Sequence, residues 1–292
     1  MEKCNIGTFQ VERVLELAKP FVPMRDFFPD LTKEMLDEAR GEISPGHVTD
    51  DDLLFMSFHS FVVKTGRHNI LVDTCCGNDK QRPSRPEFSN MNNDFLGALS
   101  RAGITADQID YVMCTHLHWD HVGWNTRLID GRWVPTFPNA KYIMGRREYD
   151  YWDQVYQSGV ESRHRNGFED SVMPLMRAEQ AILVDDDFEL EKGIWLEPCH
   201  GHSPGNVVIN LKSGSDRGIL SGDVIHHQIQ LRYPHLSPTP ADTDSGLSRK
   251  TRMAFIEAHA GTGHLLFPGH FPPPTIGRIE PRRGGDGFRY VA

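Results

Sequence analysis

Four side chains that commonly bind metal ions lie within six residues of one another in the segment 115–121, which reads Thr-His-Leu-His-Trp-Asp-His. The segment follows an apolar run that predicts a buried strand. Side chains alternate in an extended segment, so we expect His116 and His118 to face the same point. A turn after them directs Asp120 and His121 to a neighbouring point. One stretch of chain can therefore supply ligands to two metal ions.

Three more residues of the ligand type follow, each in a short loop after a predicted strand and each next to a glycine: His202, Asp223 and His270. Functional residues often collect in such loops. Imidazole and carboxylate ligands without thiolate suit Zn²⁺, and they also suit Mn²⁺, Fe²⁺ and Co²⁺. Because seven ligands exceed what one tetrahedral ion can use, we predict two divalent metal ions per chain, zinc first, with manganese, iron or cobalt as alternatives.

The elements that must position these residues are clustered strands, with helices between and after them. A hairpin is expected over 53–65 and 69–73. Apolar runs predict further strands over 109–114, 141–144, 181–184, 194–198, 206–211, 218–220, 265–267 and 288–291. Helical spacing predicts helices over 31–40, 92–102, 146–156, 168–180 and 247–260. Since no linker rich in Gly or Ser interrupts the chain, the pattern favours one α/β domain over two.

The composition is that of a globular protein of 292 residues, with 38% hydrophobic and 24% charged residues. Lys and Arg number 31 against 40 Asp and Glu, a formal net charge of −9, and the basic clusters at 249–252 and 282–283 are short. We therefore expect no nucleic-acid partner. The longest apolar stretch, 53–63, is too short for a bilayer, and the N-terminus lacks a secretory signal, so we expect no membrane partner and a cytoplasmic protein.

The cysteines and the missing nucleophile motifs bear on the type of catalysis. The five cysteines are odd in number and include no C-x-x-C pair, which argues against a disulfide framework. Cys114 and Cys199 precede ligand loops and are expected to be core residues. The sequence also lacks a G-x-S-x-G motif. These observations favour hydrolysis by metal-activated water over covalent catalysis.

The H-x-H-x-D-H segment followed by His, Asp and His resembles the metallo-β-lactamase-fold hydrolases, and within them the N-acyl homoserine lactonase and methyl parathion hydrolase group. The likeness extends from 71–74 (Leu-Val-Asp-Thr) through 137–142 to 287–290. It implies a four-layer αββα sandwich that forms a single domain over residues 1–292. In that fold, residues 1–52 are expected to be an N-terminal extension that packs on the domain or on a partner subunit. The resemblance also implies a homodimer.

The resemblance assigns the ligands to two ions. It implies one metal ion held by His116, His118 and His202. It implies a second held by Asp120, His121 and His270, with Asp223 and a hydroxide bridging both. Asp73 matches a carboxylate that orients a ligand histidine. The chain departs from the family at Cys75 and Cys76, which precede Gly77 where a glycine usually follows Asp-Thr, and at His226, where several lactonases have tyrosine.

The expected reaction is attack of the bridging hydroxide on an uncharged substrate. Asp120, Asp223 and His226 are the predicted catalytic residues: Asp120 takes or shuttles a proton, Asp223 holds both ions, and His226 donates a proton to the leaving group. A structural role for His226 is an equal alternative.

Aromatic residues near the ligands, Trp119, Trp124 and Phe271, are expected to line an apolar pocket, with Phe27 and Phe28 as further candidates. The predicted function is a dinuclear metal-dependent hydrolase of a small apolar molecule, first a lactone or ester. An aryl phosphotriester hydrolase and a hydrolytic dehalogenase of haloaromatics are alternatives, and a non-enzymatic metal-binding scaffold is a distant one.

Overall fold

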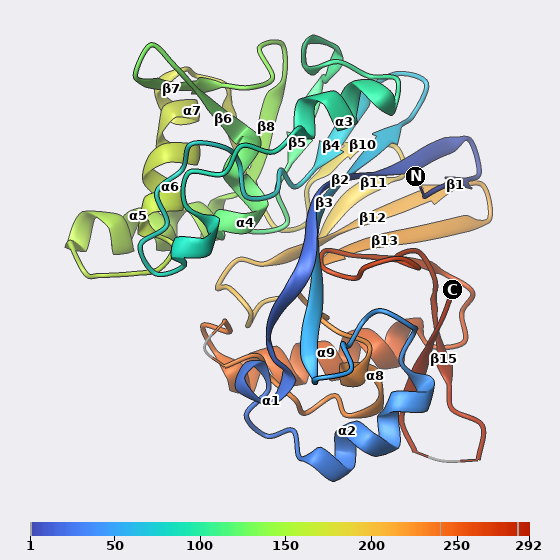
Figure 1. Cartoon of the computed structure of the whole chain (residues 1–292). Coiled ribbons are helices and arrows are strands. Elements are labelled where there is room, and N and C mark those ends of the chain that lie inside the picture. The colour runs from blue at the N-terminus through green and yellow to red at the C-terminus, as the bar shows by residue number, and fades with distance from the viewer. Residues whose placement is uncertain (1, 240, 285) are drawn as a thin grey trace. The chain divides into compact units, whose positions relative to one another are not determined.

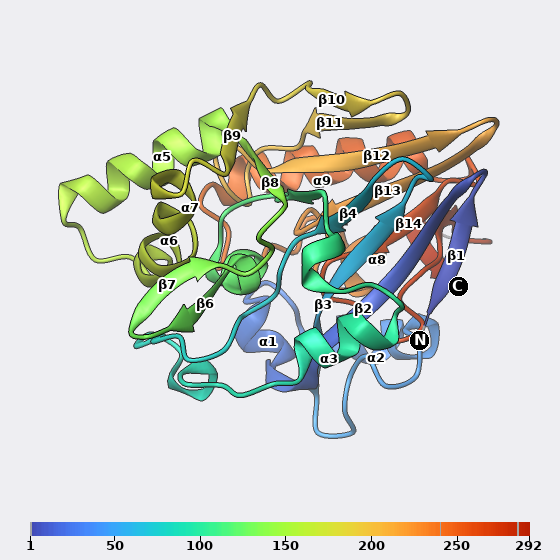
Figure 2. The same ribbon diagram turned by 90° about the horizontal axis from the view of Figure 1, so that it is seen from above.

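The computed structural model describes residues 2–239, 241–284 and 286–292, and the chain divides into two compact units. Unit 1 consists of residues 3–17 and 58–188, and unit 2 consists of residue 2 and residues 18–57 and 189–292. Figures 1 and 2 show the helices and strands of both units.

The sheet of unit 1 has seven strands in the order β1-β2-β3-β4-β5-β8-β9. These are β1 (Lys3–Ile6), β2 (Phe9–Pro23), β3 (Leu53–Lys64), β4 (Asn69–Val72), β5 (Tyr111–Met113), β8 (Lys141–Gly145) and β9 (Ala181–Val184). Strands β2 and β3 continue along the chain into unit 2. The β1–β2 and β3–β4 pairs are antiparallel, whereas β4, β5, β8 and β9 are parallel neighbours. The loops after β4 and β5 therefore leave the sheet at the same edge.

Helices and one small hairpin complete unit 1. Helices α5 (Arg146–Ser158), α6 (Arg165–Ser171) and α7 (Met173–Arg177) lie beside β8, β9 and the hairpin of β6 (Thr126–Ile129) and β7 (Arg132–Pro135). The unit also contains α3 (Phe95–Arg101), α4 (Trp119–Val122) and the 3₁₀ turns η2 (Pro86–Phe88), η3 (Ala106–Gln108) and η4 (Gly123–Asn125).

The sheet of unit 2 has five strands: β10 (Glu189–Glu191), β11 (Ile194–Pro198), β12 (Val207–Ser213), β13 (Asp216–Gly222) and β14 (Leu265–Pro268). β11–β12 and β12–β13 are antiparallel and β13–β14 is parallel, so the end of β11, the start of β12 and the ends of β13 and β14 share one edge. The remaining elements are α1 (Met24–Phe27), α2 (Lys33–Ala39), η1 (Arg40–Glu42), α8 (Ile229–Arg232), α9 (Ser245–His259) and the β15 (Arg278–Pro281)–β16 (Phe288–Val291) hairpin.

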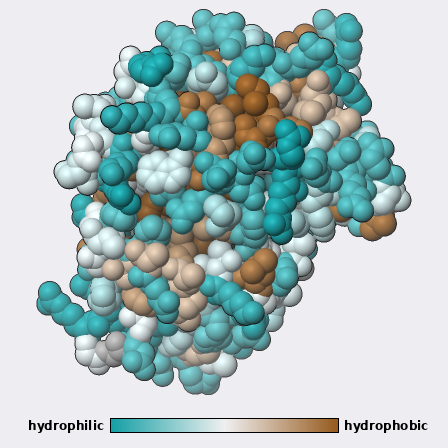
Figure 3. Space-filling view, turned by 180° about the vertical axis from the view of Figure 1, so that it is seen from behind, coloured by the Kyte–Doolittle hydropathy of each residue, from teal (hydrophilic) through white to brown (hydrophobic). Residues whose placement is uncertain are grey.

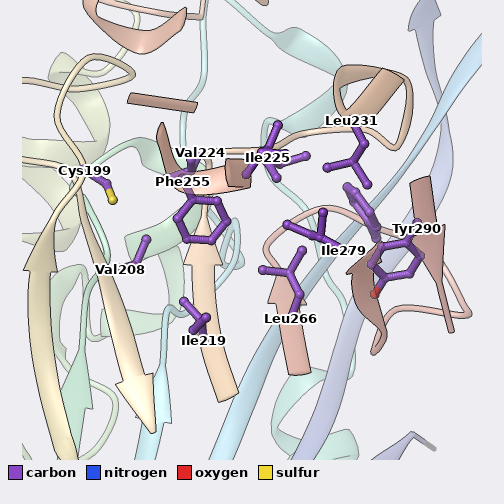
Figure 4. Packing of buried hydrophobic residues seen from close by; sticks show 12 residues of the cluster. Cys199, Val208, Ile219, Val224, Ile225, Leu231, Phe255, Leu266, Ile279 and Tyr290 are labelled. Carbon is purple, nitrogen blue, oxygen red and sulfur yellow. The ribbon is translucent and has the colours of Figure 1, made fainter. Parts of the chain in front are cut away.

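The core of unit 2 forms where α9 covers its sheet. Phe255 of α9 packs in one hydrophobic cluster with Val208, Ile219 and Leu266 from three adjacent strands (Figure 4). Tyr290 of β16 closes the other end of the cluster. Burial of these apolar side chains fixes α9 against the strands whose ends carry the candidate ligands.

The predicted α/β class is confirmed, and the predicted elements match helices or strands of the structure. The helix expected over 168–180 is broken instead into α6 and α7, because Pro174 starts a new helix and cannot continue the preceding one. Strands β1 and β2 were not predicted, since β2 buries consecutive residues instead of alternating ones. Residues 3–23 therefore form strands of the seven-stranded sheet. The single domain over 1–292 and the boundary at residue 52 stay predictions.

The exposed hydrophobic residues and the hydropathy of the helices bear on whether the chain could cross a membrane. Hydrophilic residues cover most of the face drawn in Figure 3, and hydrophobic residues gather in one larger group in its upper half and in smaller groups elsewhere. Large exposed hydrophobic side chains are scattered, among them Leu128 on β6 and Met253 on α9. In the described ranges, no helix combines the length and hydropathy that crossing a membrane requires.

Two histidines are buried together in unit 2. The ring centroids of His47 and His227 lie 6.2 Å apart, and that of His47 lies 5.7 Å from Phe271. Burial lowers the pKa of His47 to about 4 and the pKa of His227 to about 3. Both rings are therefore neutral at neutral pH, and protonating them in acid lowers the free energy of unfolding.

We expect His47→Gln to reduce the acid sensitivity of folding. The pKa of His47 is about 4 in the folded chain and about 6.5 in the unfolded chain. The contribution of neutral His47 to the free energy of unfolding is therefore complete above about pH 6.5. It is lost as the pH falls from about 6.5 to about 4, a total loss of about 3 kcal/mol. Chemical denaturation across this range should show a steeper fall for wild type than for the variant. His235→Gln, at an exposed position of unit 2, is the control, and equal slopes for wild type and His47→Gln would contradict the expectation.

Candidate metal centre

In unit 1, the candidate ligands follow two parallel strands that end at the same edge. β4 ends just before Asp73, and β5 leads into the loop that carries His116 and His118. The turn predicted after this loop is the short helix α4, which carries Asp120 and His121. The change from extended loop to helix lets neighbouring residues point in different directions.

The three histidine rings of this segment are buried and close together. The ring centroid of His116 lies 4.5 Å from that of His118 and 4.1 Å from that of His121. The metal-ligating atoms of His116 and His118 lie within 4.8 Å of each other, and so do those of Asp120 and His121. Unit 1 therefore brings its four predicted ligands together in two pairs.

Asp73 orients this segment through three contacts. Its carboxylate accepts hydrogen bonds from the backbone N–H and the Oγ1 of Thr115, both at 2.8 Å. The other contact joins Asp73 Oδ2 to His121 Nδ1 at 2.8 Å. His116 Nδ1 lies 3.1 Å from Thr115 Oγ1. In His116 and in His121, an oxygen atom lies within hydrogen-bond distance of Nδ1. This contact leaves Nε2 as the nitrogen that can bind a metal ion.

The loop after Asp73 has an unusual backbone at the point where the sequence departs from the family. Asp73 and Cys75 adopt positive φ angles of 53° and 52°, a conformation that costs free energy in non-glycine residues. Glu16 compensates by accepting the N–H groups of Cys76 (2.8 Å) and Gly77 (3.1 Å). A Cβ on Gly123 would come within 1.9 Å of the Cys76 backbone, so only glycine fits there.

Three further residues contact His118 or its neighbour Leu117, and the sequence did not point to any of them. The ring of His164 stacks on that of His118 with centroids 3.7 Å apart, and Trp152 lies 5.5 Å from His118. The buried Glu148 accepts hydrogen bonds from Leu117 N (3.0 Å) and Trp152 Nε1 (2.7 Å). None of them lies in a motif with ligand spacing, so no sequence signal could have identified them.

In unit 2, the candidate ligands also lie at one edge of a sheet. His202 lies in the loop between β11 and β12, Asp223 follows β13, and His270 follows β14. All three side chains are at most 3% exposed. His226 lies three residues after Asp223 and is equally buried.

Imidazole nitrogens approach both oxygens of Asp223. His202 Nε2 lies 3.2 Å from Oδ2, and His270 Nε2 lies 3.2 Å from Oδ1. Two ligands of a tetrahedral zinc ion, each about 2.0–2.1 Å from the metal, lie about 3.3 Å apart. Each pair therefore has the separation of two ligands on one ion. A carboxylate whose two oxygens face different histidines fits the predicted bridging role.

The other nitrogen of each of these histidines is bound to an oxygen. His202 Nδ1 lies 3.0 Å from Asp242 Oδ1, and His270 Nδ1 lies 3.2 Å from the carbonyl oxygen of Ser57. Burial alone would lower the pKa of His202, but Asp223 and Asp242 raise it to about 9. Metal binding must therefore displace a proton from His202 at neutral pH.

His226 faces Asp223 and an aromatic side chain. Its Nε2 lies 3.1 Å from Asp223 Oδ2, and its ring centroid lies 5.6 Å from that of Phe27. Burial lowers the pKa of His226. Asp223 opposes this change, and the predicted role of His226 as a proton donor, like the structural alternative, stays a prediction.

The predicted pocket residues are all buried and have packing partners. The Trp119 ring lies 5.0 Å from that of Phe88. Trp124 Nε1 donates to Glu16 Oε1 at 2.6 Å. Phe271 is 0% exposed within the core cluster of unit 2. Their assignment to a substrate pocket stays a prediction.

The cysteines and one arginine complete the electrostatics of the ligand loops. Burial raises the pKa of the Cys75, Cys76, Cys114 and Cys199 thiols, so they stay protonated and are poor metal ligands. The ligand loops contain no Lys or Arg, but the half-buried Arg163 interacts electrostatically with Asp120. Burial lowers the pKa of Arg163, and Asp120 opposes this change.

The chain is similar in sequence and in fold to known proteins. A model described as "Metallo-beta-lactamase superfamily" matches residues 58–270. Two solved structures share the fold. The hydrolase AbOPH has a TM-score of 0.80 and 21% sequence identity, and the match covers 99% of this chain and 96% of that chain. AidC, described as a dizinc quorum-quenching lactonase, has a TM-score of 0.76 and 22% identity, with the same coverage of the two chains. An N-acyl homoserine lactonase of Bacillus thuringiensis is 25% identical over 127 residues, 43% of this chain and 42% of the relative. The chain thus matches about two fifths of that relative's length.

We expect Asp73→Asn to weaken metal binding in unit 1. An amide cannot accept from both Thr115 groups and also hold His121 Nδ1, so the ring loses its orientation. Losing such a partner lowers metal affinity by about 10–100-fold. Zinc titration against a chromophoric chelator measures the change. Asp150→Asn, at an exposed site of α5, should behave as wild type, and equal affinities for Asp73→Asn and wild type would refute the orienting role.

Proposed function

Because the chain belongs to the metallo-β-lactamase superfamily, we propose that it is a dinuclear metal-dependent hydrolase of uncharged, apolar substrates, first of lactones or esters. The matched range, 58–270, contains all seven predicted ligands and Asp73. The observation that carries the proposal is the contact of the two Asp223 oxygens with two different histidines, each at 3.2 Å.

We assign the ligands as the resemblance implies. His116, His118 and His202 would hold the first ion. Asp120, His121 and His270 would hold the second, and Asp223 would be a ligand of both. The donor set of imidazoles and carboxylates supports zinc, and manganese, iron and cobalt are alternatives. That AidC is described as a dizinc lactonase also supports zinc.

The bound ions would lower the pKa of water and polarise the bond under attack. The chain's own residues then have three tasks. Asp120 accepts or shuttles the proton released during attack. His226, beside Asp223 and at the position where several lactonases have tyrosine, donates a proton to the leaving group. Asp73 and Asp242 keep the ligand rings oriented.

Substrate preference depends on the side chains around the metal ligands. These side chains must fit both the substrate and the product of its hydrolysis. The curated relative and AidC are named as lactonases, which supports a lactone. Trp119, Trp124 and Phe271 remain the candidates for an apolar wall, and Phe27 beside His226 joins them. Arg163 adds a cation near Asp120, which suits the carboxylate that opening a lactone or ester produces.

The partner assignments follow from the same reasoning. The partner is a small-molecule substrate, and neither nucleic acid nor membrane is proposed. The homodimer implied by the resemblance stays a prediction, which a molar mass from light scattering would decide.

We expect two zinc ions per chain in protein that is purified without chelator and reconstituted with Zn²⁺. Asp223→Ala should lower this number and abolish hydrolysis, because it removes a ligand from both ions. Elemental analysis and activity measure the two effects. Cys75→Ser is the control, since its thiol is protonated and is not a proposed ligand. A wild-type stoichiometry of one or below would overturn the dinuclear assignment.

Substrate class is tested by comparing kcat/KM across one panel under the same metal conditions. The panel contains N-acyl homoserine lactones of several chain lengths, p-nitrophenyl esters, a methyl phosphotriester and a chlorinated aromatic nitrile. We expect lactones or esters to exceed the other two by at least about tenfold, because the pocket wall must discriminate among substrates. Turnover of only phosphate monoesters, nucleic acid or β-lactams would contradict the uncharged substrate class.

A further inference from the structure

Arg252 of α9 has a fully buried guanidinium that bonds to several segments of unit 2. Its Nε donates to the carbonyl oxygen of Val224 at 2.9 Å. Its Nη1 donates to the carbonyl oxygens of Pro234 (2.9 Å) and Leu236 (2.7 Å), and its Nη2 donates to Ser248 Oγ at 2.9 Å. One side chain therefore connects segments that are otherwise separate in the sequence.

The same guanidinium lies beside the carboxylate that holds a candidate ligand. Arg252 Nη2 lies 3.6 Å from Asp242 Oδ2, and both side chains are 0% exposed. Asp242 Oδ1 lies 3.0 Å from His202 Nδ1. His202 Nε2 in turn lies 3.2 Å from Asp223 Oδ2. Arg252, Asp242 and His202 therefore form a chain of polar contacts that leads to Asp223.

The backbone contacts of Arg252 also involve the segment that carries Asp223 and His226. Val224, whose carbonyl Arg252 binds, directly follows Asp223. The carbonyl of Leu236 also accepts from Gln230 Nε2 at 2.9 Å, and Gln230 Oε1 accepts from the backbone N–H of His226 at 2.7 Å. Arg252 thus binds the backbone between Asp223 and His226 directly, and it is linked to the His226 backbone through Leu236 and Gln230.

The His202 loop also rests directly on α9. A Cβ on Gly201 would lie 2.3 Å from the backbone nitrogen of Ser248, so the loop and the helix are in close contact. Thr251 Oγ1 donates to the carbonyl oxygen of His200 at 2.7 Å. The position of His202 is therefore set by the part of α9 that carries Arg252.

We propose that Arg252 is a positioning residue for the metal centre, which fixes His202 through Asp242 and the Asp223 segment through Val224. The inference rests on the proposed metal-dependent function. Neutral donors could satisfy the carbonyl groups, but only a cation balances Asp242 in a buried site. An ionised Asp242 in turn makes the His202 ring a stronger ligand.

The test compares zinc dissociation constants of the full chain, measured by chelator competition after metal removal. Arg252→Met keeps the bulk of the side chain but removes its charge, and we expect about 10–100-fold weaker binding of one of the two ions. Arg252→Lys keeps the charge with fewer hydrogen bonds and should lie between Met and wild type. The visible spectrum of the Co²⁺-loaded protein should change in the same order.

A matched control separates positioning from stability. Arg82 of unit 1 is also buried and pairs with Asp170 at 2.7 Å. Arg82→Lys should lower the melting temperature and leave the zinc affinities unchanged. If Arg82→Lys weakened zinc binding as much as Arg252→Met does, the effect would be one of general stability, and the positioning role would be wrong.

A double-mutant cycle with Asp242→Asn tests the route. If Arg252 acts through Asp242, the effects of Arg252→Lys and Asp242→Asn on zinc affinity are not additive. Additive effects, or wild-type affinity in folded Arg252→Met, would refute the inference. If Arg252→Met does not fold, the cycle of Arg252→Lys with Asp242→Asn is sufficient. Non-additive effects on zinc affinity support the positioning role, and additive effects refute it. Wild-type protein that binds no zinc would instead contradict the proposed function itself.

Discussion

A buried histidine presents one nitrogen to a metal ion in a fixed direction only if its other nitrogen is held, and this constraint governs both units. Asp73 holds His121, Asp242 holds His202, and the carbonyl oxygen of Ser57 holds His270. These partners come from strand ends and from loops far away in the sequence. The surrounding fold is therefore as much a part of the candidate centre as the ligands are.

Holding these partners requires buried charge and a strained backbone. Asp73 and Cys75 have positive φ angles, and Glu16 stabilises the loop by accepting two backbone N–H groups. Asp242 is ionised in a buried position because an imidazole and Arg252 flank it. Buried polar groups of this kind make the geometry of a site rigid when their hydrogen bonds and charge partners are all present.

The sequence was sufficient to predict the α/β class, the β3–β4 hairpin and the ligand candidates, because alternation and motif spacing are local. It was not sufficient for β2, which buries consecutive residues, or for the break between α6 and α7. It also missed Asp242, which lies 40 positions from His202, and Glu16, which reaches Trp124 across 108 positions. Such contacts depend on how the chain folds back on itself, and no local pattern encodes them.

The order of the proposed ligands along the chain determines the order in which they are synthesised. Residues 58–188 of unit 1 are made before most of unit 2, so His116, His118, Asp120 and His121 leave the ribosome first. At about 5–20 residues per second, His270 follows His121 after roughly 7 to 30 s. During that interval the early ligands exist without their proposed partners, and they can hold an ion only loosely. In the proposed assignment, the complete ligand set therefore exists only after His270 has been made.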